Sequence, residues 1–108
     1  MARPYVADIA GGTATVTIQI QGSQTFRNWT VSALNAAAGK IELSTSPTSQ
    51  IGTAQPDPSV IARVSLGSAA AGNSSVFMVV PINLPAKAFQ NVYVHCTGAG
   101  NLGTSILH

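Results

Sequence analysis

Charged side chains are scarce in this sequence. It has five basic and three acidic residues among 108, whereas about a quarter of an ordinary soluble domain is charged. The apolar fraction is an ordinary 45%, so Ser, Thr, Asn, Gln, Gly and Ala replace the missing charges, and the core is not enlarged. Because charge is what keeps free monomers apart, this composition favours a subunit of an assembly over a solitary enzyme.

The few charges do not cluster. The net charge is +2, and the charged residues are spread along the chain: Arg3, Asp8, Arg27, Lys40, Glu42, Asp57, Arg63 and Lys87. A nucleic-acid partner would require Lys and Arg gathered into a patch or stripe. We therefore expect no nucleic-acid partner.

The sequence has one cysteine and no long apolar run. Cys96 has no second cysteine with which to form an intramolecular disulfide, so the fold is not expected to depend on an oxidising compartment. No apolar run approaches the length of a membrane span. The apolar stretch after Arg3 is interrupted by Asp8 and then by two glycines, which is not the pattern of a signal peptide. We expect synthesis in a cytoplasm and no membrane partner.

Catalytic and cofactor motifs are also missing. Residues 98–103 fit the pattern G-x-G-x-x-G, but five residues follow them, too few for a helix that would receive a pyrophosphate. His95 and Cys96 are neighbours on an expected strand and point to opposite faces, so they cannot share a metal or act as nucleophile and base. The sequence predicts a non-enzymatic protein with no cofactor and no metal.

Alternation of apolar and polar residues is the dominant positive pattern. In residues 13–21 every second residue is apolar, as expected of a strand with one buried face. In residues 40–45 the same rule sets Ile41 and Leu43 toward the core and Glu42 and Ser44 on the opposite, polar face. Strands are expected at residues 5–9, 13–21, 28–34, 40–45, 60–66, 75–82, 91–97 and 102–107.

Residues 75–82 depart from this alternation. The run from Val76 to Val80 is apolar at every position. A continuous apolar strand is typical of one that is covered on both faces. We expect its second face to be covered by a partner subunit.

About eight short strands with Gly and Pro between them predict one all-β domain over residues 1–108. The expected architecture is an antiparallel β-sandwich of jelly-roll type. An immunoglobulin-like sandwich is the alternative, although the cysteine pair around a core Trp is absent. Two segments lack the pattern of a core strand: an N-terminal arm at residues 1–9 and a long Pro-rich loop at residues 46–59, either a surface loop or an arm that reaches a neighbour. Residues 86–89 predict only a short turn.

Two aromatic residues are the natural candidates for stacking on a sugar. Trp29 shares its face with Val31 and Ala33, which favours a core position. Tyr93 shares the polar face with His95, so an exposed or intersubunit position and a buried one are equally compatible with the pattern.

The segment Y-V-H-C-T-G-A-G-N-L-G-T-S-I-L at residues 93–107 combines a strand, a Thr-Gly-Ala-Gly turn and a short closing strand. It resembles the C-terminal hairpin of small cement or decoration proteins from the virions of tailed bacteriophages. This resemblance implies a jelly-roll-like protomer, usually trimeric, that sits on the capsid shell and clamps neighbouring capsomers. The same hairpin is also compatible with a tail or fibre component.

Two functional hypotheses follow. The first is a virion structural protein, made in the host cytoplasm, that forms a homo-oligomer, most often a trimer, and bridges subunits of the major capsid protein. The second is a small carbohydrate-binding module or lectin, favoured by the Asn-, Gln- and Thr-rich composition and by Tyr93. The candidate partner contacts are Arg3, Pro4, Tyr5, Pro56, Asp57 and Tyr93.

Overall fold

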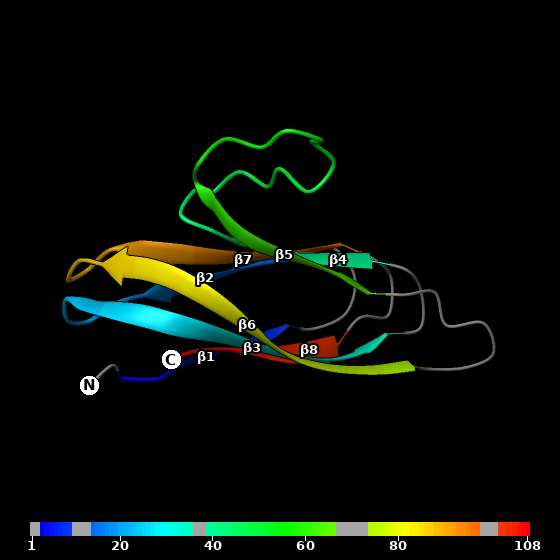
Figure 1. The fold of residues 1–108 in the computed structure, drawn as a ribbon, viewed down its shortest axis with the longest axis horizontal. Coiled ribbons are helices and arrows are strands. Elements are labelled where there is room, and N and C mark those ends of the chain that lie inside the picture. The colour runs from blue at the N-terminus through cyan, green and yellow to red at the C-terminus, as the bar shows by residue number, and fades with distance from the viewer. Residues whose placement is uncertain (1–2, 10–13, 36–38, 67–73, 98–101) are drawn as a thin grey trace.

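Eight antiparallel strands form two four-stranded sheets that lie face to face (Figure 1). This computed structural model describes residues 3–9, 14–35, 39–66, 74–97 and 102–108. The strands are β1 (Tyr5–Ile9), β2 (Ala14–Gln19), β3 (Gln24–Asn35), β4 (Gly39–Ser44), β5 (Val60–Leu66), β6 (Ser74–Ala86), β7 (Asn91–Thr97) and β8 (Leu102–Leu107).

The strand order is that of a jelly roll. Sheet A has the order β1-β8-β3-β6 and sheet B the order β2-β7-β4-β5, so consecutive strands lie in different sheets except for β4 and β5, which pair in sheet B. Eight strands in two such sheets are the jelly-roll arrangement. The expected all-β sandwich is confirmed, and strands β1, β5, β7 and β8 have the expected bounds.

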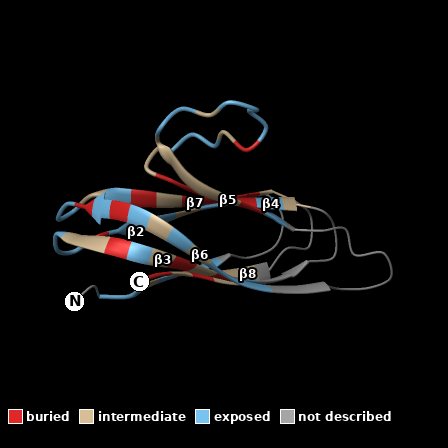
Figure 2. Ribbon diagram, in the orientation of Figure 1, coloured by how far each residue is buried: buried red, intermediate tan, exposed pale blue. Residues whose placement is uncertain are grey.

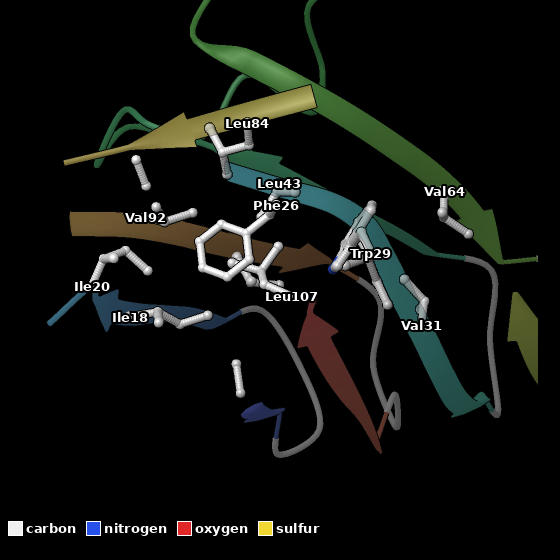
Figure 3. Packing of buried hydrophobic residues seen from close by; sticks show 14 of the residues in the cluster. Ile18, Ile20, Phe26, Trp29, Val31, Leu43, Val64, Leu84, Val92 and Leu107 are labelled. Atoms are coloured by element: carbon white, nitrogen blue, oxygen red, sulfur yellow. The ribbon is translucent and has the colours of Figure 1, made fainter. Parts of the chain in front are cut away.

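The core fills the space between the sheets with side chains from both (Figures 2 and 3). Phe26 and Trp29 of β3 are fully buried there, against a layer that includes Leu43 and Val94 of sheet B. Each side chain of this size contributes about 2 kcal/mol by leaving water. The core position expected for Trp29 is confirmed, and this ring is therefore not available to stack on a sugar.

Strands β3 and β6 are longer than expected because they pair with each other over almost their whole length. The pairing contains a bulge at Arg27, where the register shifts between Phe26 and Asn28. Ile82 and Asn83 of β6 there oppose the single residue Arg27 of β3, so two residues oppose one, as a bulge requires.

The expected C-terminal hairpin is wrong. Strand β7 lies in sheet B, whereas β8 lies in sheet A between β1 and β3. Ladder hydrogen bonds to β1 and β3 occupy both edges of β8, so it cannot also pair with β7. The Gly-rich turn of the resemblance falls at residues 98–101, outside the described part of the chain.

The N-terminal arm is shorter than expected, and of the two alternatives for residues 46–59 the structure has the surface loop. Residues Tyr5–Ile9 form β1, paired residue by residue with β8 and contributing Ala7 to the core, so only Arg3 and Pro4 of the described arm precede the sheet. The loop at residues 46–59 is a surface loop that lies on the outer side of sheet B (Figure 1). It is bonded to that sheet and does not extend freely.

Candidate functional site

A row of polar side chains crosses the outer face of sheet B, beneath the loop at residues 46–59. The register aligns Thr15, His95, Glu42 and Arg63 across β2, β7, β4 and β5. Glu42 and His95 are buried, 0% and 1% exposed, and so is the neighbouring Ser44. The alternation placed these side chains on the polar face opposite the core, and they are buried there because the loop returns over that face.

The ion pair between Arg63 and Glu42 fixes the loop to the sheet. Arg63 Nε donates to Glu42 Oε2 at 3.1 Å, while its other nitrogens donate to the carbonyls of Thr53, at 2.9 Å, and of Gln50. The second carboxylate oxygen of Glu42 accepts from the backbone N–H of Gln50 at 3.1 Å. The charges are thus desolvated together with hydrogen bonds that replace water, which is the condition for a buried pair to be tolerated.

His95 is held by a bond on each ring nitrogen. Nε2 lies 2.9 Å from the carbonyl of Ser46 and must donate to it, so in the neutral ring Nδ1 accepts from the Thr15 hydroxyl, 2.9 Å away. The ring of Tyr93 stacks on it with centroids 6.1 Å apart and an angle of 5°. Both nitrogens are engaged with the protein, so this histidine is arranged to hold the loop and not to transfer protons.

Asp57 organises the loop from within. Its carboxylate accepts from the backbone N–H of Ser59 at 2.9 Å and from the hydroxyl of the same residue. Hydrogen bonding by Gln50, and then by the side chain and backbone of Ser59, holds the pKa of Asp57 below its ordinary value of 3.8. The ionised carboxylate is therefore part of the folded loop.

The outer face of sheet A is the opposite case: it is nearly uncharged and exposes several apolar side chains. Two rows cross its four strands: Val6, Ile106, Thr30 and Val79 form one, and Asp8, Thr104, Ser32 and Phe77 form the other. Val6 is 59% exposed, Val79 49% and Phe77 74%. The only charged residues in these four strands are Asp8, which accepts from the Thr104 hydroxyl at 3.0 Å, and Arg27.

A groove lies at one end of the sandwich, where two turns meet. It has a volume of about 950 Å³ and is lined by residues 23–25 and 85–90, from the β2–β3 and β6–β7 connections. A smaller groove of about 320 Å³ shares Ser23 and Gln24 with it and is lined also by Arg3 and Tyr5. Figure 2 shows the turns at this end in the colour of exposed residues.

The β6–β7 turn exposes an aromatic ring on a strained backbone. Phe89 is 68% exposed and has φ of 63°, in the left-handed region that glycine prefers. A bulky residue there is an outlier whose cost is about 1 kcal/mol or more. Hydrogen bonds hold the turn in place: Phe89 N donates to the carbonyl of Ile20 at 2.5 Å and Gln90 N to that of Lys87 at 3.1 Å.

The six residues expected to contact a partner fall in two places. At the grooved end Arg3 and Pro4 are exposed; the guanidinium of Arg3 lies 5.7 Å from the ring centre of Tyr5. Tyr5 is half-buried, packed edge-on against Phe26, with its hydroxyl accepting from the backbone of Gln21 at 2.8 Å.

The other three lie on the side of sheet B. Pro56 and Asp57 belong to the loop, and Tyr93 is half-buried beside His95. Sequence reasoning missed Phe89, because the segment Lys-Ala-Phe-Gln contains no glycine to indicate a left-handed residue. It also missed the burial of Glu42 and His95.

Neither a metal centre nor a membrane helix is found in the described part of the chain. No group of three His, Cys, Asp or Glu residues there could hold a metal ion, and no described helix has the length and hydropathy to cross a membrane. Comparisons with models of protein families, with curated proteins and with solved structures find no match to this chain.

Proposed function

We propose that this chain is a non-enzymatic structural subunit that associates with copies of itself through the outer face of sheet A. The observation that carries the proposal is the pair of rows that expose Val6, Val79 and Phe77 on a sheet face with almost no charge. Large apolar side chains exposed together on one sheet face mark protein contacts. Low charge removes the repulsion that would otherwise oppose the approach of a second copy.

The setting we propose is the virion of a tailed bacteriophage. The subunit is a capsid decoration protein, trimeric as in the family that its C-terminal segment resembles, which is made in the host cytoplasm and binds the major capsid protein. The jelly-roll strand order and the low charge support this role. Several weak contacts made at once by an oligomer multiply its affinity for a shell, so single contacts need not be strong.

The association is tested by placing charge on the apolar face. Replacing Phe77 and Val79 together by Lys should raise the dissociation constant of the oligomer at least about tenfold, because each copy would bring two like charges into the contact. The matched control replaces Thr17 and Gln19 by Lys, on exposed positions of β2 in sheet B. Light scattering coupled to size exclusion should show an oligomer for the wild type and the control, and a monomer for the Phe77 and Val79 variant.

The virion role is tested separately. Shells assembled from the major capsid protein encoded in the same genome should co-sediment with the wild type and much less with the monomeric variant. A wild type that is monomeric at tens of micromolar contradicts the assembly proposal. An oligomer that does not bind shells contradicts the decoration role and leaves a tail or fibre component as the setting.

A further inference from the structure

The groove at the end of the sandwich is a rigid structure. Its two turns are bonded to each other: Ile20 N donates to the carbonyl of Gln90 at 2.9 Å, Phe89 N donates to the carbonyl of Ile20, and Ala88 N donates to Ser23 Oγ at 3.2 Å. Because these bonds join the β2–β3 turn to the β6–β7 turn, the groove between them exists before any ligand arrives. A preformed site loses less entropy on binding than one that must be ordered.

Phe89 lines this groove with a ring that the fold itself does not need. The ring is 68% exposed, so little of its area stabilises the core, and the left-handed backbone beneath it would suit glycine better. Strain of this kind persists at positions where a side chain serves binding. A flat apolar surface fixed at the edge of a polar groove is suited to stack against another flat, partly apolar ring.

The polar groups of the groove are biased toward donors. Three side-chain acceptors of its lining are used inside the protein: Gln24 Oε1 accepts from the backbone of Arg3 at 2.5 Å, Gln90 Oε1 from the backbone of Lys87 at 3.0 Å, and Ser23 Oγ from Ala88. This leaves the amide N–H groups of both glutamines and the Lys87 ammonium directed at no described protein acceptor.

The linings of the two grooves at this end include cations. Arg3 lines the smaller groove and Lys87 the larger, and the residues that line the two include no Asp or Glu. Two of the five basic residues of the chain are therefore at this end. The ligand that complements such a lining is rich in acceptors and carries negative charge.

We propose that this groove binds an acidic saccharide, with the apolar face of a sugar ring on Phe89 and a carboxylate at Lys87. The glutamine amides donate to sugar hydroxyl and ring oxygens, and Arg3 extends the positive potential toward a neighbouring residue of the same glycan. The inference is independent of the proposed assembly through sheet A, because the groove lies at the end of the sandwich and not on that face.

A saccharide suits the groove better than an extended peptide. A peptide added to a sheet edge gains its affinity from backbone hydrogen bonds. Strand β6 is an edge strand of sheet A, but Pro81 and Pro85 have no N–H to donate, and Pro85 lines the groove itself. Side-chain amides beside an exposed aromatic ring instead match the hydroxyl groups and apolar face of a pyranose.

The experiment titrates the protein with trigalacturonic acid and, as a neutral match, with its methyl ester. Chemical-shift changes in ¹⁵N–¹H spectra should concentrate at residues 23–25 and 85–90 and should be much smaller with the ester. Phe89→Ala and Lys87→Gln should each weaken binding at least about tenfold, the loss of one stacking or charged contact. Controls are Thr17→Ala and Lys40→Gln, which remove an exposed hydroxyl and an exposed ammonium on sheet B, away from the groove and from the outer face of sheet A.

The Phe89→Gly variant separates binding from folding. It should raise the midpoint of thermal unfolding by about 4 °C, because glycine relieves the left-handed strain, and it should abolish saccharide binding. Loss of binding with a gain of stability cannot come from a damaged fold. The proposal is overturned if trigalacturonic acid does not bind, or if the control variants lose as much affinity as the groove variants. It is also overturned if the NMR signals of the groove residues shift only with a peptide, tested as a tripeptide that ends in phenylalanine.

Discussion

The outer faces of the two sheets differ in exposure in the opposite sense to their polarity. Sheet B carries a charged and polar row, yet its own loop covers that row and buries Glu42 and His95. Sheet A exposes Val79 and Phe77 to solvent although their side chains are apolar. Polarity alone therefore does not decide exposure in this chain. A polar face becomes buried when a segment of the same chain lies over it and forms hydrogen bonds with its side chains.

The contrast between the covered face of sheet B and the exposed face of sheet A is tested most strongly by replacing one arginine on each face. Arg63→Met should lower the free energy of unfolding by about 3 kcal/mol, because it leaves the buried Glu42 carboxylate without its ion pair. Arg27→Met on sheet A should change stability by less than about 0.5 kcal/mol, since the Arg27 side chain is exposed and, among the described residues, hydrogen-bonds only to the side chain of Asn83. Urea denaturation measures both.

A double variant refines this result. Adding Glu42→Gln to Arg63→Met should recover part of the lost stability, because the uncompensated charge is then gone. If Arg63→Met is as mild as Arg27→Met, the covered face does not depend on the ion pair and the contrast between the sheets is wrong.

A second test asks whether a buried hydroxyl matters because it is buried or because it is paired. Ser105 Oγ lies on the inner side of sheet A, buried and without a hydrogen-bond partner, so Ser105→Ala should raise stability by about 1 kcal/mol. Ser44 Oγ is also buried but accepts from Ser46 N at 3.0 Å, and Ser44→Ala should lower stability by about 1 kcal/mol. Equal signs in thermal unfolding would refute the distinction.

The smallest effect concerns pH and the loop on sheet B. Since the folded-state pKa of Asp57 is below its ordinary value of 3.8, the ionised carboxylate favours the folded state at all pH values above 3.8. This contribution should be lost as pH falls from 3.8 through the lowered folded-state pKa. Asp57→Asn should remove that part of the pH dependence from unfolding curves measured between pH 5 and about 2. An unchanged slope would show that Asp57 does not hold the loop.

Local alternation was enough to predict that eight strands form and which side of several of them faces the core. The apolar positions of β2 and β3 indicated Ile18, Ile20 and Trp29 as buried, and the structure buries all three. This works because a strand sends alternate side chains to opposite faces whatever its neighbours are. For the run from Val76 to Val80 the sequence predicted a second face covered by a partner subunit; Phe77, Met78 and Val79 are exposed in the single chain, and the partner stays a prediction.

Features that depend on distant segments were not predictable in this way. The burial of Glu42 and His95 depends on the loop that covers them. The position of that loop cannot be derived from its Pro-rich sequence. The pairing of β8 with β1 and β3 depends on how the whole chain is divided between the two sheets. The adjacency of β7 and β8 in sequence therefore wrongly indicated that these two strands pair. Phe89 gave no signal because its conformation is imposed by bonds to the β2–β3 side of the molecule.

The pairing of β1 with β8 also sets the order in which the chain can fold. The hydroxyl of Thr104 reaches the carboxylate of Asp8 across 96 residues of sequence, and β8 occupies a position between β1 and β3. Contacts so distant in sequence must overcome a large loop-closure entropy, which slows folding. During synthesis β1 must wait for β8 to leave the ribosome, so sheet A is completed last, and its β1 and β3 edges stay unpaired until then.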